Sequence, residues 1–293
     1  MTQHRLADNT KVKSRLWVDF INNTAHPREQ IGQFRISNRL ANKYGMNFYL
    51  ITEVGPGLFP GETHKLQFNI TDGSQIAIMT QSATKVMASP LGTAATVEQS
   101  FTVSSGCDLI FMPEPIIAFG ASALQSLTVV FLEPGSSAIV TEIIGVVAET
   151  IFFASAPTID ATVEIRRGPN HLIIDRVAVQ ANPLFGALHS WKSVTGGSGC
   201  VGSMYFAGLG LDFSRRLIVH LAKLEPSSYE IAALEVTDPD DELVIVRARS
   251  SDAASISNFF AALANWLDTS RAPEPDMPPL GLSNLPADHG EQD

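Results

Sequence analysis

The sequence predicts a mainly β protein, with one large domain of many short antiparallel strands in stacked sheets and about two α-helices. Three observations support this prediction. Short apolar or alternating runs follow one another from Gln33 to about Ala248, and turn residues interrupt them roughly every 8–12 positions. Two segments near the C-terminal end show helical spacing of apolar residues instead. The 293-residue chain is 45% hydrophobic and 17% charged, so it can bury a large core.

The individual strands follow from alternation and from turn chemistry. Residues 62–70 alternate, with Leu66, Phe68 and Ile70 on one side. The turn at residues 71–74 contains an Asp-Gly pair, which is typical of a β-hairpin. Residues 75–80 are apolar on both faces, so we expect this strand to be covered on both sides. Further strands are expected at residues 46–54, 96–104, 109–112, 125–132, 138–147, 161–166 and 172–179.

Two helices are expected after residue 210. Residues 213–224 have apolar side chains at nearly helical spacing and end before Pro226, which cannot continue a helix. Residues 256–267 place Phe259, Phe260 and other apolar residues on one helix face. Asp252 is the expected N-cap of this second helix.

The domain organisation follows from composition. Residues 1–30 are polar and lack sustained periodicity, so we expect a loosely ordered N-terminal arm. Residues 31–271 form the β domain. Residues 272–293 are rich in Pro, Gly and acidic residues, which predicts a disordered tail.

Charge and cysteine usage restrict the class of protein. The 20 Lys and Arg against 30 Asp and Glu give a net charge of −10, which argues against nucleic-acid binding. No apolar run reaches the roughly 18–20 residues that span a bilayer, and no signal segment is recognisable, so no membrane partner is expected. Cys107 and Cys200 form no CxxC pair, and we expect both to be buried thiols of a cytoplasmic protein.

The usual catalytic motifs are absent from the sequence. It contains no GxSxG elbow, no HExxH, no GxxxxGK[ST] phosphate loop and no GxGxxG between a strand and a helix. No two of the seven histidines are spaced i, i+2 or i, i+4, so no stable metal site is visible locally. We therefore expect a protein that is not an enzyme, with no catalytic residues.

Polar residues in apolar surroundings are the chemically unusual feature. The run at residues 80–85 (TQSATK) continues directly from an apolar strand, and Glu114 stands between two prolines. Glu142 and Glu149 lie in the most apolar stretch, where a carboxylate is costly unless it is paired, protonated or bound to a cation. Two interpretations fit these polar residues: a polar channel inside the β body, or ordinary buried ion pairs. The candidate residues are Glu53, Thr80, Gln81, Thr84, Lys85, Glu114, Glu142 and Glu149.

Four segments together resemble one known family. They are residues 55–62 (GPGLFPGE), residues 80–86 (TQSATKV), residues 109–116 (LIFMPEPI), and Val246-Arg247 followed by a helix with Trp266 and then Arg271. Each alone is weak, but their order and spacing match the urease accessory protein UreD family, also called UreH, from about residue 45 to residue 271. The matched glycine-rich loop implies a structural role for Gly55, Pro56, Gly57, Pro60, Gly61 and Glu62.

The resemblance implies a scaffold for nickel insertion into apo-urease. Members of the family bind the accessory protein UreF, reach the GTPase UreG through it, and dock onto urease. A polar path through the body would pass Ni²⁺ in transit, with no tightly bound cofactor and no stable metal site. Two alternatives stay open: a β-sandwich hydrolase that uses Glu114 with Glu142 or Glu149, and a divergent UreD-like adaptor without a nickel role.

Overall fold

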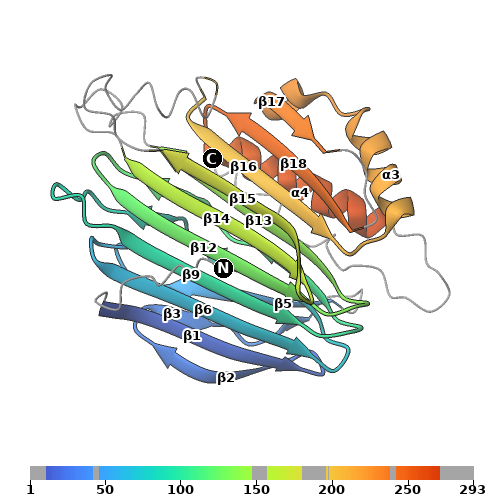
Figure 1. Ribbon diagram of the computed structural model, residues 1–293, viewed down its shortest axis with the longest axis horizontal. Coiled ribbons are helices and arrows are strands. Elements are labelled where there is room, and N and C mark those ends of the chain that lie inside the picture. Colours follow the sequence, from blue (N-terminus) through green and yellow to red (C-terminus); the bar gives the residue numbers. More distant parts are fainter. Residues whose placement is uncertain are drawn as a thin grey trace, which may run out of the picture.

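The protein consists of two stacked β-sheets and a helical layer. The computed structural model describes residues 11–41, 46–146, 157–179, 196, 198–237 and 242–270. Figure 1 shows the seven-stranded sheet in front and the helices beside the far end of the second sheet. The expected class is confirmed: the described chain is mainly β, in stacked sheets, with helices α3 (Leu211–Leu221) and α4 (Ala253–Ser270) and the 3₁₀ turn η1 (Pro226–Tyr229).

The two sheets draw strands from almost the whole described chain. Sheet A has the order β15-β14-β12-β9-β6-β1-β2, and sheet B the order β17-β18-β16-β13-β10-β7-β5-β3, with β4, β8 and β11 at its side. The strands of sheet A are β1 (Lys11–Ile21), β2 (Thr24–Ile31), β6 (Glu62–Thr71), β9 (Ala95–Val103), β12 (Ala123–Leu132), β14 (Thr158–Arg167) and β15 (Asn170–Val179). Those of sheet B are β3 (Phe34–Ile36), β4 (Leu40–Ala41), β5 (Asn47–Glu53), β7 (Gln75–Gln81), β8 (Thr84–Val86), β10 (Asp108–Met112), β11 (Ile116–Ala118), β13 (Ser137–Val146), β16 (Cys200–Ala207), β17 (Ile231–Val236) and β18 (Leu243–Ser250).

The centre of both sheets is parallel, which differs from the expected antiparallel pairing. From β6 to β14 the chain passes alternately through sheet A and sheet B, so that β6, β9, β12 and β14 pair in parallel. On the other side, β5, β7, β10 and β13 also pair in parallel. Antiparallel pairs occur at the margins, for example between β14 and β15 and between β13 and β16. The chain therefore winds as a coil, with each turn of the coil supplying one strand to sheet A and one or two strands to sheet B.

The turns around Gly73, Gly106 and Gly135 are corners between the two sheets and not hairpins. Residues 71–74 connect β6 of sheet A to β7 of sheet B, so the hairpin interpretation of its Asp-Gly pair was wrong. Gly73, Gly106 and Gly135 have φ of 66°, 72° and 79° at three successive corners, a conformation that favours glycine. Backbone hydrogen bonds join one corner to the next, since the N–H of residue 108 donates to the carbonyl of Ser74 at 3.0 Å.

The N-terminal segment is part of the β body. Residues 11–31 form β1 and β2, and β1 pairs in parallel with β6 through most of its length. The expected loosely ordered arm is therefore wrong for residues 11–30, because Leu16, Val18 and Phe20 alternate and are fully buried. Residues 1–10 and the expected tail at residues 272–293 lie outside the described residues.

Three apolar clusters hold the layers together. Two of them lie between the sheets: one around Phe68, Phe101 and Phe111 near the corner turns, and a smaller one around Leu124 and Ile144. The third cluster joins sheet B to α3 and α4. Among the described residues, no helix combines the length and the apolar character needed to cross a bilayer.

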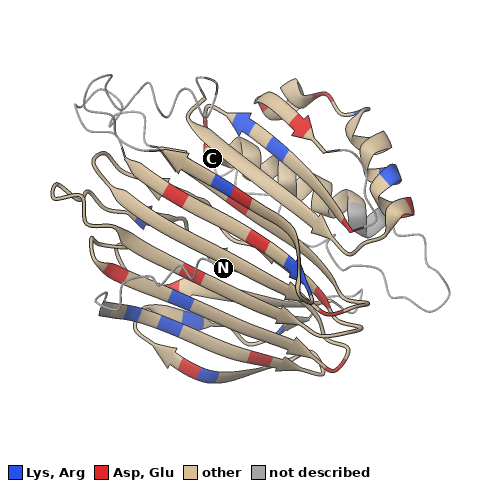
Figure 2. Ribbon diagram, in the orientation of Figure 1, with Lys and Arg blue, Asp and Glu red and all other residues tan. Residues whose placement is uncertain are grey.

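The outer face of sheet A is charged. Figure 2 shows Lys and Arg beside Asp and Glu on neighbouring strands of this sheet. Lys65 and Glu98 are register partners on β6 and β9, with 2.8 Å between Nζ and Oε2. Arg176 of β15 likewise pairs with Asp160 of β14 at 2.6 Å. Such cross-strand pairs suit a sheet face that meets water, which leaves the opposite face of sheet A for the space between the sheets.

The C-terminal helix lies against sheet B as its apolar stripe predicts. The backbone N–H of Ser255 donates to Oδ1 of Asp252 at 2.9 Å, which confirms Asp252 as the N-cap. Gly202 of β16 allows the close approach of this helix. A Cβ at this position would lie 2.6 Å from Cγ2 of Ile256 and 3.0 Å from the ring of Phe260.

We predict that Gly202→Ala destabilises the protein by about 1–3 kcal/mol, because the added methyl group overfills the contact between β16 and α4. Urea denaturation followed by circular dichroism measures this loss. In an Ile256→Ala background the same substitution should cost clearly less, since the nearest clashing atom is gone. Equal costs in the two backgrounds would contradict the packing explanation.

Candidate functional site

A layer of polar side chains separates the two apolar clusters between the sheets. On β13, Val140 belongs to one cluster and Ile144 to the other, and Glu142 lies between them on the same side of the strand. The same order recurs on neighbouring strands of both sheets. We call this set the polar layer, and its members are Glu53, His64, Thr80, Thr84, Gln99, Glu114, Thr128, Glu142, Asp175 and Ser203.

An internal cavity of about 40 Å³ runs along most of this layer. Such a volume holds about three or four water molecules, because one water needs roughly 10–15 Å³. Both sheets supply its walls. The polar residues that line it are Glu53, His64, Thr80, Ser82, Thr84, Gln99, Glu114, Thr128, Thr141 and Glu142.

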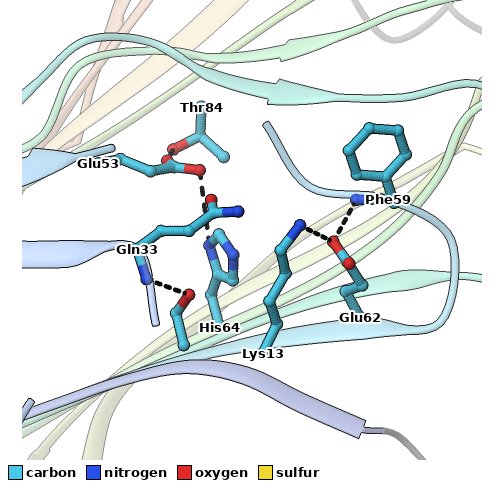
Figure 3. A network of polar contacts seen from close by, with 8 residues as sticks. Lys13, Gln33, Glu53, Phe59, Glu62, His64 and Thr84 are labelled. Atoms are coloured by element: carbon cyan, nitrogen blue, oxygen red, sulfur yellow. Dashed lines mark hydrogen bonds and ion pairs between the residues drawn. The ribbon is translucent and has the colours of Figure 1, made fainter. Parts of the chain in front are cut away.

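At one end of the polar layer Glu53 and His64 face each other across the two sheets. Glu53 ends β5 of sheet B, and His64 belongs to β6 of sheet A. Their side chains are only 8% and 1% exposed, and 3.9 Å separates Oε1 of Glu53 from Nδ1 of His64. Figure 3 shows both side chains turned toward the amide of Gln33. The hydroxyl of Thr84 donates to Oε2 of Glu53 at 3.3 Å.

Three polar atoms at this end are buried without a hydrogen-bond partner in the part of the chain that the structure describes. They are Oε1 of Gln33, Oε1 of Glu53 and Nε2 of His64. Burial raises the pKa of Glu53, although Thr84 and Lys13 act in the opposite direction. Burial, with Lys13 as a lesser cause, lowers the pKa of His64 to about 4, so the imidazole is neutral near pH 7.

At the other end of the polar layer Asp175 has two hydrogen-bond donors as partners. The hydroxyl of Tyr205 and the guanidinium of Arg247 both donate to Oδ2 of Asp175, each at 2.7 Å. Glu142 lies nearby, and burial, followed by the charge of Asp175, raises its pKa to about 7. Arg247 is 36% exposed, so this end approaches the surface between β15 and β18.

The glycine-rich loop at residues 55–62 is held by several contacts within the described chain. Glu62 accepts a hydrogen bond from the backbone N–H of Phe59 at 2.9 Å and pairs with Lys13 at 2.8 Å. Gly57 has a φ of 122°, and a Cβ there would lie 2.5 Å from the carbonyl oxygen of Lys85. The loop is thus fixed against β8, close to the Glu53 end of the polar layer (Figure 3).

The structure brings together most of the candidate residues. Glu53, Thr80, Thr84, Glu114 and Glu142 all line the cavity. Gln81 and Lys85 do not, because alternation along the chain turns both side chains to the exposed side, so their placement as buried residues was wrong. Glu149 lies outside the described residues.

Sequence reasoning missed several members of the site. His64 stands two positions before Leu66 in the alternating strand, so its inward direction could have been read from the pattern. Asp175, Tyr205 and Arg247 come from three different strands, and no local signal relates them. Their contact depends on the pairing of β16 with β18 and on the stacking of the two sheets.

The site is a small polar cavity. A ligand pocket of ordinary size holds about 300–1,000 Å³, so a cavity of about 40 Å³ has no room for a sugar between Glu114 and Glu142. No group of three or more His, Cys, Asp or Glu that could hold a metal ion occurs within the described ranges. Cys107 and Cys200 are buried free thiols, as expected.

Comparisons with known proteins point to one family. The family model described as UreD urease accessory protein matches residues 22–279. The urease accessory protein UreD of Lachnoclostridium phytofermentans is 31% identical over 115 residues, which cover 39% of this chain and 41% of that protein. That of Trichodesmium erythraeum is 31% identical over 122 residues, 41% of this chain and 43% of its own. The aligned part thus spans about two fifths of the length of these curated relatives.

We predict that stability depends on pH through Glu142. Its pKa of about 7 in the folded protein exceeds the ordinary value of 4.5, so the folded state binds more protons between these values. Relative to Glu142→Gln, the wild-type protein should therefore lose about 1–3 kcal/mol of stability as the pH rises from 5 to 8, at about 1.4 kcal/mol per pKa unit. Urea denaturation across this range measures the difference, and parallel pH profiles would refute the assignment.

Proposed function

We propose a function that starts from the family of this chain. The chain belongs to the UreD urease accessory protein family, and in our proposal it is a scaffold for nickel insertion into apo-urease. In this role it is not an enzyme and holds no resident cofactor. It offers a polar path along which Ni²⁺ passes. The observation that supports this proposal most directly is the polar layer with its cavity between two apolar clusters.

The donor types in the polar layer suit an ion in transit. Carboxylates, hydroxyls and amides line the cavity, with one imidazole at its end, and no Cys or His cage is found among the described residues. Imidazole and carboxylate groups bind Ni²⁺, but scattered ligands hold it weakly enough for release. A tight site would retain the ion and stop its delivery.

The surroundings of the polar layer favour a path with two ends. The apolar clusters on either side exclude water from the rest of the space between the sheets. The layer extends from Glu53 and His64, on β5 and β6, to Asp175 and Arg247, on β15 and β18. These strands lie in opposite halves of their sheets, with β9, β12 and β14 between them in sheet A. An ion could therefore enter at one side of the body and leave at the other.

The partners in this proposal are proteins of the urease system. We propose that the chain binds a UreF-type accessory protein, through it a UreG-type GTPase, and apo-urease, in the cytoplasm. In this arrangement the scaffold bridges the enzyme and the accessory complex. The alternative of a divergent adaptor predicts the same partners but no dependence of nickel delivery on the polar layer.

Reconstitution tests the proposed function. The chain is co-expressed with UreF, UreG and apo-urease, and urease activity and nickel content are compared with and without it. If the chain joins the complex and both quantities depend on it, the proposal holds. If it neither joins the complex nor raises the activity, the urease role is wrong for this chain.

We predict that Glu142→Gln lowers urease activation and the nickel content of urease about ten-fold, a typical effect of losing one metal-interacting carboxylate. The complex itself should still form, because the substitution conserves size and lies inside the body. Glu98→Gln on the outer face of sheet A is the matched control and should change neither quantity. Equal activation by both variants would favour the adaptor without a nickel role.

A further inference from the structure

We propose that Glu53 and His64, with Oε1 of Gln33 as a neighbouring donor, form a binding site for a divalent cation of the nickel class at one end of the polar layer. The purpose of this site, to load the cargo ion, rests on the proposed function. Its existence can be tested on the isolated protein. We call it the Glu53–His64 site.

The geometry places two ligand groups of different type at a distance that one ion can bridge. The 3.9 Å between Oε1 of Glu53 and Nδ1 of His64 is too long for a hydrogen bond. It is shorter than twice a metal–ligand distance, since such bonds to nitrogen or oxygen measure about 2.0–2.2 Å. Glu53 and His64 come from different sheets, so the site joins the two walls of the body.

The buried atoms at this place lack the positive partner that their chemistry requires. Oε1 of Glu53 and Oε1 of Gln33 are acceptors, and a neutral imidazole presents one bare nitrogen. Buried acceptors without partners are costly. The nearest basic side chain is Lys13, and its ammonium is engaged by Glu62 at 2.8 Å. A divalent cation between Oε1 of Glu53 and Nδ1 of His64 would supply a positive partner to this carboxylate oxygen, and the imidazole proton would then reside on Nε2.

The surroundings fit a site that releases its ion. Only two strong ligands converge here, so binding should be weaker than in a closed structural site. Glu53 and His64 both line the cavity, whose water can occupy the remaining coordination positions. An imidazole with a carboxylate favours nickel, zinc or copper over magnesium, which prefers oxygen ligands alone.

The local backbone holds the ligands in place. The ring of Phe34 packs edge-on against the imidazole of His64, with 4.8 Å between ring centroids. Gln33 is fixed through its backbone, because its N–H donates to Oγ of Ser14 at 2.9 Å and its carbonyl accepts from the N–H of residue 54 at 2.8 Å. Thr84 orients the Glu53 carboxylate from the opposite side. Figure 3 shows Oε1 of Glu53 and Nδ1 of His64 on facing sides, with the amide of Gln33 beside them.

The test is an isothermal titration calorimetry experiment, in which the purified, untagged full chain is titrated with NiCl₂ at constant pH. We expect His64→Leu and Glu53→Gln each to weaken one nickel site at least ten-fold or to abolish it. A parallel titration with MgCl₂ should show no binding at this site. His64→Leu should remain folded, because leucine suits the apolar contacts of this position and removes an unpartnered polar atom.

A second His–Glu pair provides the matched control. His171 and Glu164 lie 2.8 Å apart on the surface of sheet A, and Glu164 also pairs with Arg166. Because His171 is exposed and Glu164 is already paired with Arg166, His171→Leu should leave the nickel titration unchanged. X-ray absorption of the nickel-loaded protein should further show an imidazole ligand that is lost in His64→Leu and kept in His171→Leu.

The outcomes separate this inference from the proposed function. No nickel binding by the wild-type chain, or equal binding by the wild type and both site variants, would overturn the Glu53–His64 site and would indicate that a water molecule or a proton satisfies these groups. Loss of nickel binding in the variants supports the site even if the chain fails to activate urease. In that case only the urease role would be wrong.

Discussion

The parallel register between successive coils is the constraint on which the rest of the structure depends. Backbone hydrogen bonds align β6, β9, β12 and β14, so that residues at the same position along each strand lie beside one another. Because side chains alternate along each strand, this alignment collects apolar residues at two depths and polar residues between them. A slip of one residue would turn the whole set outward and expose the apolar faces. The polar layer is thus a consequence of register and not of any single motif.

The sequence predicted the strands better than their pairing. Alternation and turn residues located β5, β6, β9 and most later strands, because both signals are local. The same turn residues suit a hairpin or a corner, so they could not tell whether the next strand returns to its own sheet or enters the other one. The coils also differ in length and share no motif, which hid the repetition of the architecture from the sequence.

The candidate site was predictable only in part, because the sequence carries local signals but does not show which strands become neighbours. Glu142 could be found because a carboxylate in an apolar run is conspicuous wherever the run folds. Lys85 was predicted to be buried but is exposed. Neighbouring residues of a strand point to opposite faces, so an error of one position moves a side chain from the cavity to the solvent. Asp175 and Arg247 were missed because 72 positions separate them, and only the stacking of the sheets brings their charges together.

The two ends of the polar layer differ in a way that argues for function. At the other end Asp175 accepts hydrogen bonds from Tyr205 and Arg247, and such an arrangement is compatible with a purely structural role. At the Glu53 end one carboxylate oxygen, one amide oxygen and one imidazole nitrogen are buried without a hydrogen-bond partner in the described chain. Apolar side chains at these positions would fold at lower cost, because burying unpartnered polar groups destabilises a protein. In an adaptor that only holds proteins together, this loss of stability would serve no function. A protein that binds and releases a cation, in contrast, requires ligands that have no other partner until the ion binds.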